Sequence, residues 1–333
     1  MARFSDGPIP GFPLATSLRY LSFTNLMAIF LGIDDGGSKT RCLVGDEGCL
    51  LGVGEAGGSN VVRLGETVAR ANLRQAIAAA CDAAGLLPSD IEHVCVGVAG
   101  ASVREVNTAV REAVRELVPG EVEVVGDMVI ALASAFADQP GVIVIAGTGS
   151  IAFGRNAQGQ SARAGGWGYA VSDEGSGHWV GRHALSAVLR AHDEGRDTAL
   201  TAAVLQAWNA GDLRDLVRAA NAHPAPDFAQ LFPVVLQSAK EGDELAASLL
   251  AQAGAELAAL AKVVIQRLWA RGVQMRVAMG GGVFQHSPQV RRVFLNAVRA
   301  EHPSAAVCFR VVDASEGALL LARRSSVHVH APR

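Results

Sequence analysis

The most informative segment of this chain reads Leu31-Gly32-Ile33-Asp34-Asp35-Gly36-Gly37-Ser38-Lys39-Thr40. An apolar run ends in acidic residues, and a glycine-rich turn that carries hydroxyl groups follows. Glycine lets the backbone come close to a ligand, and successive amide N–H groups in such a turn form a concave anion site. A carboxylate beside that site is expected if a divalent cation accompanies the anion. The segment therefore indicates a site for Mg–nucleotide phosphates; the alternative is a glycine-rich hairpin turn between two strands.

The composition is that of a globular protein with a large core. The chain has 333 residues, enough for two domains of ordinary size, and is 50% hydrophobic and 18% charged. A net charge of −3 and a pI near 6.3 give no electrostatic footprint for nucleic acid or for an anionic membrane. No apolar run approaches the ~18 residues that cross a bilayer. We therefore expect neither a nucleic-acid partner nor a membrane span.

The five cysteines lie far apart, mostly in apolar segments, and form no C-x-x-C pair. This pattern favours reduced core thiols in a cytoplasmic protein over a zinc site or a disulfide framework. Residues 1–27 contain scattered proline and glycine and no apolar stretch typical of a signal peptide. We expect these residues to form a disordered extension, with Met27 as a start of the functional chain.

The order of apolar and amphipathic stretches predicts two similarly built halves. In the first, strands are expected at 28–34, 41–46, 49–53, 91–98 and 121–125, and helices at 67–84, 103–117 and 127–137. The second begins with a strand at 141–146, a Gly-Thr-Gly-Ser turn and a strand at 151–154, which echo residues 31–44. Mostly helical sequence at 176–270 precedes a strand at 276–279, a helix at 287–300, a strand at 306–311 and a helix at 315–324. Alternating strands and helices, with a meander at the start, indicate an α/β fold with mixed sheets.

Glycine-bearing loops follow three of the expected strands, at residues 36–40, 147–150 and 280–282. Their spread along the chain resembles the superfamily of sugar kinases, actin and heat-shock ATPases. A further segment reads Ala164-Gly165-Gly166-Trp167-Gly168-Tyr169-Ala170-Val171-Ser172-Asp173-Glu174-Gly175-Ser176. This G-G-W-G followed by D-E-G-S is similar to N-acetylglucosamine kinases and the wider BadF/BadG-type ATPase family. The match runs in order from about residue 28 to 324.

The resemblance implies a fold of two ribonuclease H-like (actin-like ATPase) domains with mixed sheets flanked by helices. The active site is then expected in the cleft between the domains. The first domain would span residues 28–138 and the second residues 139–312. The helix at 313–325 would pack back on the first domain.

The resemblance also implies roles for the glycine loops in binding ATP. The expected phosphate-contacting residues are Gly36, Gly37, Ser38 and Thr40 in the first loop and Gly147, Thr148, Gly149 and Ser150 in the second. Gly280, Gly281 and Gly282 in the third loop would approach the adenosine. Asp34 is expected near Mg²⁺, acting through water, because Mg²⁺ usually keeps several of its waters.

Asp127 follows a strand in Val125-Gly126-Asp127 and matches the family's catalytic carboxylate. It would accept the proton of the sugar 6-hydroxyl group as that oxygen attacks the γ-phosphoryl group. Phosphoryl transfer needs mainly alignment, charge neutralisation and a proton acceptor. The alternative role of Asp127 is to cap the helix that follows, which aspartate also suits.

Acceptor-binding residues are implied by the same resemblance. Asn60 in Gly58-Ser59-Asn60 matches a sugar-contacting asparagine, and Gly166, Trp167, Gly168 and Asp173 match the family's sugar-binding segment. One aromatic ring and several polar groups suit the apolar face and hydroxyl rim of a pyranose. The alternatives are a core aromatic at Trp167 and, for Asp173, a charge that favours the start of the helix near Ser176.

Two features depart from familiar patterns. Asp35 stands where the family usually has glycine and Ser38 where it has threonine, so Asp35 adds negative charge near the expected phosphate site. The segment Gly52-Val53-Gly54-Glu55-Ala56-Gly57 satisfies G-x-G-x-x-G, but no helix opens on its last glycine, so dinucleotide binding is not expected.

The resulting hypothesis is an ATP- and Mg²⁺-dependent kinase that converts N-acetylglucosamine to N-acetylglucosamine 6-phosphate. Glucosamine and N-acetylmuramic acid remain alternative acceptors, and the sequence leaves a homodimer open. A different class, an ATPase activator of a dehydratase or reductase, would need a cysteine pair for an iron–sulfur cluster, which is missing near the glycine loops. A sugar-responsive repressor would need an N-terminal helix-turn-helix, for which residues 1–27 are too short.

Overall fold

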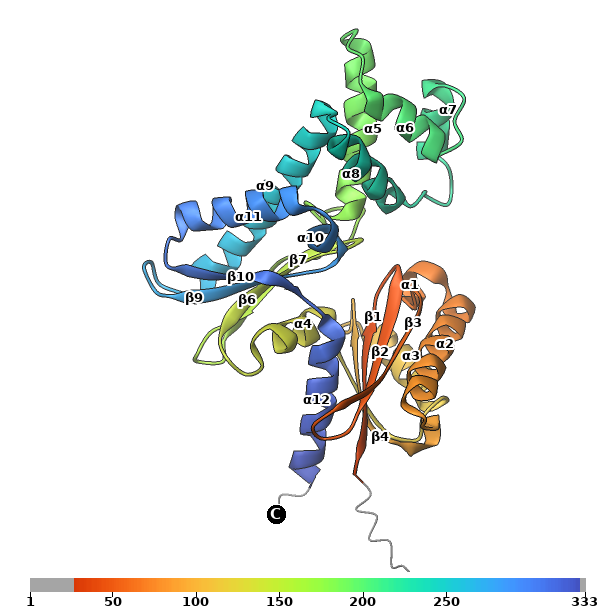
Figure 1. Cartoon of the computed structure of the whole chain (residues 1–333), viewed down its shortest axis with the longest axis vertical. Helices are drawn as coiled ribbons and strands as arrows, with labels where there is room; N and C mark the ends of the chain where they lie inside the picture. Colours follow the sequence, from red (N-terminus) through yellow and green to blue (C-terminus); the bar gives the residue numbers. More distant parts are fainter. Residues whose placement is uncertain (1–26, 330–333) are drawn as a thin grey trace, which may run out of the picture.

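The computed structural model describes residues 27–329, so the expected extension lies outside the described residues, apart from Met27. Two five-stranded sheets, each flanked by helices, make up the fold (Figure 1). This architecture confirms the predicted α/β class with mixed sheets.

The first sheet has the strand order β3-β2-β1-β4-β5. Its strands are β1 (Ile29–Asp35), β2 (Lys39–Gly45), β3 (Leu50–Gly57), β4 (Ile91–Val98) and β5 (Glu121–Gly126). The helices of this part are α1 (Val61–Leu64), α2 (Glu66–Ala84), α3 (Arg104–Arg115) and the short η1 (Pro88–Asp90). Leu31 and Ile33 of β1 are fully buried in a cluster with α2 and α3, whereas Phe30 points to the opposite face. This alternation is what a strand with both faces covered requires.

The second sheet repeats the topology of the first. Its order is β8-β7-β6-β9-β10, formed by β6 (Gly141–Ala146), β7 (Ser150–Arg155), β8 (Ser161–Gly165), β9 (Met275–Gly280) and β10 (Ala305–Val312). In each sheet the first strand pairs antiparallel with the second and parallel with the fourth. The expected echo between the two halves is therefore a repeated fold.

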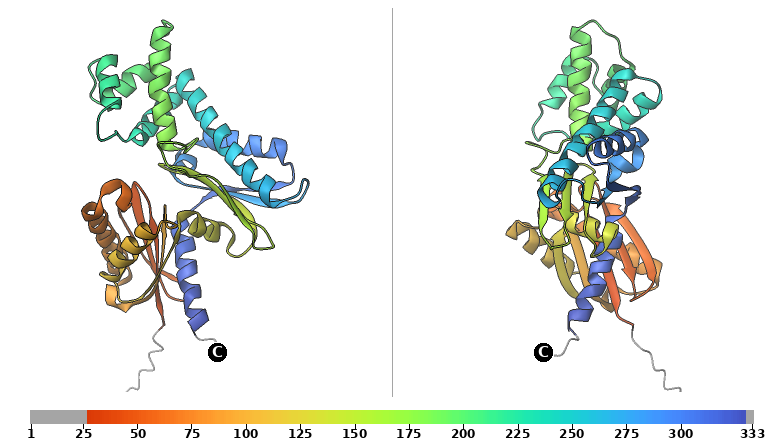
Figure 2. Two further views of the ribbon diagram at one scale, coloured as in Figure 1. Left: turned by 180° about the vertical axis from the view of Figure 1, so that it is seen from behind. Right: turned by 90° about the vertical axis from the view of Figure 1, so that its left-hand side faces the viewer.

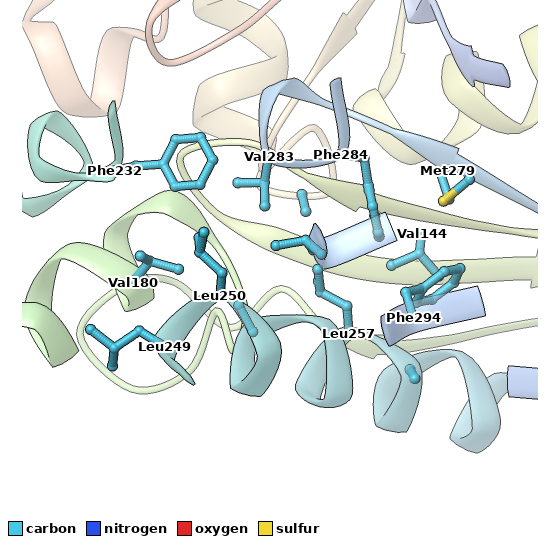
Figure 3. Close-up of a cluster of buried hydrophobic side chains, with 14 of the residues drawn as sticks. Val144, Val180, Phe232, Leu249, Leu250, Leu257, Met279, Val283, Phe284 and Phe294 are labelled. Atoms are coloured by element: carbon cyan, nitrogen blue, oxygen red, sulfur yellow. The ribbon is translucent and has the colours of Figure 1, made fainter. Parts of the chain in front are cut away.

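Helices follow the strands of the second sheet. They are α5 (Gly177–Asp193), α6 (Ala199–Ala207), α7 (Leu213–Ala220), η2 (Phe228–Leu231), α8 (Phe232–Lys240), α9 (Glu244–Leu268), α10 (Gly282–His286) and α11 (Pro288–Glu301). Of these, α9, α10 and α11 pack on the sheet, and the others form a helical group beside α9 (Figure 1). Leu249, Leu250 and Leu257 of α9 pack with Phe284 and Phe294 in the core shown in Figure 3. By length and composition α9 alone among the described helices could cross a membrane, but its apolar residues form this core.

Two helices connect the sheets. α4 (Asp127–Phe136) follows β5 and leads into β6, and α12 (Ala314–Val329) follows β10 and returns to the first sheet (Figures 1 and 2). α12 packs on Phe30 through Leu319, and α4 packs on the second sheet through Phe136. α4 and α12 also pack closely against each other.

The structure differs from the sequence prediction at two strands. β8 was not predicted, because its sequence Ser161-Ala162-Arg163-Ala164-Gly165 has no large apolar residue and only small side chains face the core. β3 continues to Gly57, four residues beyond the predicted end, so the G-x-G-x-x-G segment is a strand. A Cβ atom at Gly54 would lie 2.1 Å from the Ala76 carbonyl oxygen of α2. These glycines therefore serve close strand–helix packing, and no helix opens on Gly57.

Candidate active site

The first two glycine loops meet at the junction between the sheets. The first glycine turn (residues 36–38) joins β1 to β2, and the second glycine turn (residues 147–149) joins β6 to β7. The hydroxyl groups of Ser38 and Thr148 lie 2.8 Å apart, although the two residues are 110 positions apart in the chain. The structure thus brings two expected phosphate-contacting hydroxyl groups together from opposite sheets.

The second glycine turn is held by the start of α5. The backbone N–H of Gly177 donates to the Gly147 carbonyl at 2.8 Å, and that of His178 donates to the Thr148 carbonyl at 3.2 Å. The N–H of Gly147 donates across the turn to the Gly149 carbonyl at 2.9 Å. The bonds from Gly177 and His178 use N–H groups that have no partner inside the helix, and they fix the turn at the end of β6.

The third glycine loop lies directly beside the second. Gly281 has a φ of 91° and comes before α10. A Cβ atom on Gly281 would lie 2.4 Å from the Ala146 carbonyl oxygen, at the residue before the second glycine turn. Only glycine fits this conformation and this approach, so the loop at 280–282 and the second glycine turn form one surface.

Acidic residues gather beside the first glycine turn. Asp34 is the last residue but one of β1, Asp127 begins α4 and Asp313 precedes α12, and all three are half-buried. Burial, together with the charges of Asp127, Asp313 and Asp35, raises the pKa of Asp34 to about 7. Carboxylates that crowd in this way favour a cation beside them. Among the described residues no group of three or more acidic, histidine or cysteine side chains has the arrangement of a metal cage.

Asp127 begins α4 but is not its cap residue, so the alternative role considered for it is wrong. Its carboxylate accepts a hydrogen bond from the Met128 N–H at 2.8 Å; the cap position itself is Gly126. Burial raises the pKa of Asp127, and the backbone hydrogen bonds oppose this rise. A raised pKa brings a carboxylate closer to the working pH and makes it a better proton acceptor.

Asp35 points to the other face of β1, away from Asp34. The Ser59 hydroxyl donates to Asp35 Oδ1 at 2.7 Å and lies 2.6 Å from Thr40 Oγ1, which donates to the Gly57 carbonyl at 2.9 Å. Burial raises the pKa of Asp35 to about 6, whereas the hydrogen bond that Ser59 donates lowers it. Asp35 therefore faces a buried pair of hydroxyl groups and not the side of the strand on which Asp34 lies.

The expected sugar-binding residues lie on two sides of the junction. Asn60 is half-buried and follows β3, whereas Gly166, Trp167 and Gly168 follow β8. Gly166 and Gly168 have φ values of 69° and 94°. Trp167 is 67% exposed, so the alternative of a core aromatic is wrong. Its ring lies 4.2 Å below the guanidinium group of Arg163.

Three expected ligand contacts are turned inward. The buried hydroxyl of Ser150 donates to the Glu174 carbonyl at 2.7 Å, and Thr40 is fully buried in the Asp35 chain of contacts. Asp173 has a φ of 74°, and its carboxylate lies 3.4 Å from the Ser150 N–H. Burial raises the pKa of Asp173. Asp173 supports the second glycine turn, and the helix start near Ser176 is capped by Ser176 itself.

Sequence reasoning missed Asp313 and Arg41. Arg41 on β2 lies opposite Asp34, and its Nε atom is 2.9 Å from Asp313 Oδ2. Asp313 also accepts a hydrogen bond from the Ser315 N–H at 3.0 Å, at the start of α12. An Asp-x-Ser before a helix signals only a cap, so nothing in the sequence links Asp313 to Asp34. Two surface hollows of about 300 and 260 Å³ lie elsewhere and contain none of the expected site residues.

Comparisons with known proteins agree with this geometry. The family model described as the BadF/BadG/BcrA/BcrD ATPase family matches residues 31–322. An N-acetylmuramic acid/N-acetylglucosamine kinase of Clostridium acetobutylicum is 31% identical over 303 residues, covering 89% of this chain and 99% of that protein. An N-acetyl-D-glucosamine kinase of Dictyostelium discoideum is 30% identical over 313 residues, covering 89% and 98%. A crystal structure of a proposed N-acetylglucosamine kinase from Chromobacterium violaceum superposes with a TM-score of 0.72 at 30% identity, covering 89% and 99%.

Proposed function

The chain belongs to the BadF/BadG/BcrA/BcrD ATPase family, and we propose that, as an ATP-dependent amino sugar kinase of that family, it phosphorylates the 6-hydroxyl group of N-acetylglucosamine. The observation that carries this proposal is the junction where Ser38, Thr148 and the half-buried carboxylate of Asp127 come from different elements. Hydroxyl groups facing each other suit phosphate oxygens, and the carboxylate suits the proton of an attacking hydroxyl group.

The proposed mechanism uses few groups. The glycine turns hold the β- and γ-phosphates, and Asp127 takes the proton of the sugar 6-hydroxyl group as its oxygen attacks the γ-phosphorus. The backbone N–H of Met128 keeps the Asp127 carboxylate oriented at the start of α4. Alignment of the attacking and leaving oxygens then supplies most of the rate enhancement.

The carboxylates beside the first glycine turn fit Mg²⁺. Asp34, with Asp127 and Asp313 close enough to raise its pKa, would hold the ion through water. Mg²⁺ supplies charge neutralisation of the phosphates when it is bound with ATP. Arg41 keeps Asp313 paired, so Asp34 and Asp127 are the carboxylates that remain for the ion and the sugar.

A sugar panel with ATP and Mg²⁺, followed by ADP release, tests the proposed function. We expect a higher kcat/KM for N-acetylglucosamine than for glucose, because a polar site built for the acetamido group leaves its own groups unpaired when that group is missing. Asn60→Ala should reduce this preference. Equal turnover of the two sugars would contradict the acceptor, and no turnover of any amino sugar would contradict the function.

The contact between Ser38 and Thr148 predicts a shared role in binding ATP. Thr148→Val keeps the side-chain volume but removes the hydroxyl group, and Ser38→Ala does the same in the first turn. Since a hydrogen bond to a charged group contributes about 1.5–3 kcal/mol, we expect the KM for ATP to rise roughly tenfold or more in each variant. The KM for the sugar should change little. Ser186→Ala, at an exposed serine of α5, is the control, and a rise in the sugar KM instead would contradict the assignment.

One observation favours N-acetylmuramic acid as a second acceptor. Arg163 lies opposite Phe153 on β7, and Phe153 packs with α4, so Arg163 is on the α4 side of the sheet. It is half-buried, stacks on Trp167 and forms no ion pair with any described residue. A half-buried guanidinium group that forms no ion pair within the described residues suits a carboxylate on a ligand. N-acetylmuramic acid differs from N-acetylglucosamine by a lactyl ether that bears a carboxylate.

We therefore expect Arg163→Gln to lower kcat/KM for N-acetylmuramic acid roughly tenfold relative to N-acetylglucosamine, the size expected for one charge-assisted contact. Arg267→Gln is the matched control, because Arg267 is a neighbouring cation that donates to the Arg163 carbonyl oxygen at 3.0 Å. An equal loss for both sugars would show that Arg163 only supports Trp167.

A further inference from the structure

Asp35 connects the two loops that are expected to hold ATP and the acceptor. Its side chain is 2% exposed, and its partners Ser59 and Thr40 are 2% and 0% exposed. Ser59 comes directly before Asn60, whereas Asp35 comes directly before the first glycine turn. Through contacts of 2.7 Å and 2.6 Å with Asp35 and Thr40, the Ser59 hydroxyl therefore joins the loop that carries Asn60 to the residues that flank the first glycine turn.

The backbone reinforces this connection. The loop at residues 57–60, called here the Asn60 loop, lies against the first glycine turn: the Ser59 N–H donates to the Gly36 carbonyl at 3.2 Å. A Cβ atom at Gly58 would lie 2.4 Å from the Gly37 carbonyl oxygen, so the two backbones touch. On its other side, the Gly58 carbonyl accepts a hydrogen bond from Asn72 of α2 at 2.7 Å. The Asn60 loop is thus held between α2 and the first glycine turn.

We propose that Asp35 is a positioning residue that fixes Asn60 relative to the first glycine turn, and so sets the place of the acceptor sugar relative to the γ-phosphoryl group. This inference rests on the proposed function. A misplacement of about 1 Å can cost on the order of 10²-fold in rate, so a buried link between the two binding loops affects catalysis without touching either substrate.

The carboxyl group completes the link between the two loops. With glycine at position 35, as in the family pattern, the Ser59 and Thr40 hydroxyls would have only each other and the Gly57 carbonyl. Asp35 gives Ser59 a second partner from the strand that carries the first glycine turn. Buried polar chains of this kind rigidify a site when every member is satisfied.

Asp35→Ala removes the link, and Asp35→Asn keeps a side chain of the same shape that still bonds Ser59. In Asp35→Ala we expect the KM for N-acetylglucosamine to rise roughly tenfold, which corresponds to about 1.4 kcal/mol, and kcat to fall. The KM for ATP should stay within about twofold of the wild-type value, because the glycine turn keeps its own hydrogen bond between Gly36 and Lys39. Asp35→Asn should restore the sugar KM to within about threefold of wild type. Ser59→Ala cuts the chain with a smaller change and should reproduce the Asp35→Ala result if that variant folds poorly.

Thr198→Ala provides the control for lost stability. Thr198 donates to the half-buried carboxylate of Asp243 at 2.5 Å, far from the junction, so its loss lowers the melting temperature without affecting either KM. Equal rises of the sugar and ATP KM values in Asp35→Ala, or a change of melting temperature alone as in Thr198→Ala, would overturn the inference. Loss of the proposed function is recognised separately, because the wild-type protein would then fail to phosphorylate N-acetylglucosamine.

Discussion

Asp127→Asn will lower the kcat for sugar phosphorylation on the order of 10²-fold or more, because the variant lacks the proton acceptor at the attacking hydroxyl group. Its fold and nucleotide affinity should stay near those of the wild type. Asparagine retains an oxygen that accepts the Met128 N–H, so the start of α4 keeps its hydrogen bond. Removing one of several crowded carboxylates also relieves repulsion with Asp34 and Asp35.

The measurement is ADP release with saturating N-acetylglucosamine, together with calorimetric titration of ATP and a thermal unfolding curve. Asp193→Asn, at an exposed acid at the end of α5, is the matched control and should leave all three unchanged. Activity of Asp127→Asn within a few-fold of the wild type would refute Asp127 as the proton acceptor. A large loss of ATP affinity would move Asp127 from the acceptor to the nucleotide side of the site.

Gly317→Ala will destabilise the protein by roughly 3 kcal/mol, the upper end of typical overpacking costs. Gly317 lies on α12 where that helix crosses α4, and a Cβ atom there would be 1.8 Å from the Ile130 carbonyl oxygen and 2.5 Å from the Ser134 nitrogen. Alanine favours a helix over glycine by about 1 kcal/mol, which is too little to offset a collision with backbone atoms. At about 2–4 °C per kcal/mol, the melting temperature should fall roughly 6–12 °C.

Thermal and urea unfolding measure this effect, and kcat should fall as well because α4 carries Asp127. Gly48→Ala is the control: the nearest atom to an added Cβ, an Asp46 carboxylate oxygen, is 4.0 Å away, so stability should change by less than about 0.5 kcal/mol. A melting temperature of Gly317→Ala equal to that of the wild type would show that α4 and α12 separate freely. The close packing of α4 against α12 would then contribute nothing to the free energy of unfolding.

Local sequence patterns determined the class of the fold and the identity of the turns. Apolar runs ending in glycine and hydroxyl residues mark strand ends and turns because these properties depend on the residues themselves and their near neighbours. For the same reason the position of Asp127 between β5 and α4 follows from the sequence. The similarity of the two halves follows in part, since each begins with a strand, a glycine turn and a second strand, whereas β8 carries no such local signal.

Only the tertiary structure decided what these residues do to one another. Ser38 meets Thr148 across 110 positions, and Arg41 pairs with Asp313 from the end of the second sheet. The glycines of β3 serve packing on α2, a purpose that their spacing does not reveal. The raised pKa of Asp34 depends on burial and on carboxylates brought from three separate segments. Burial and charge proximity are properties of the assembled fold, so no local pattern of residues contains them.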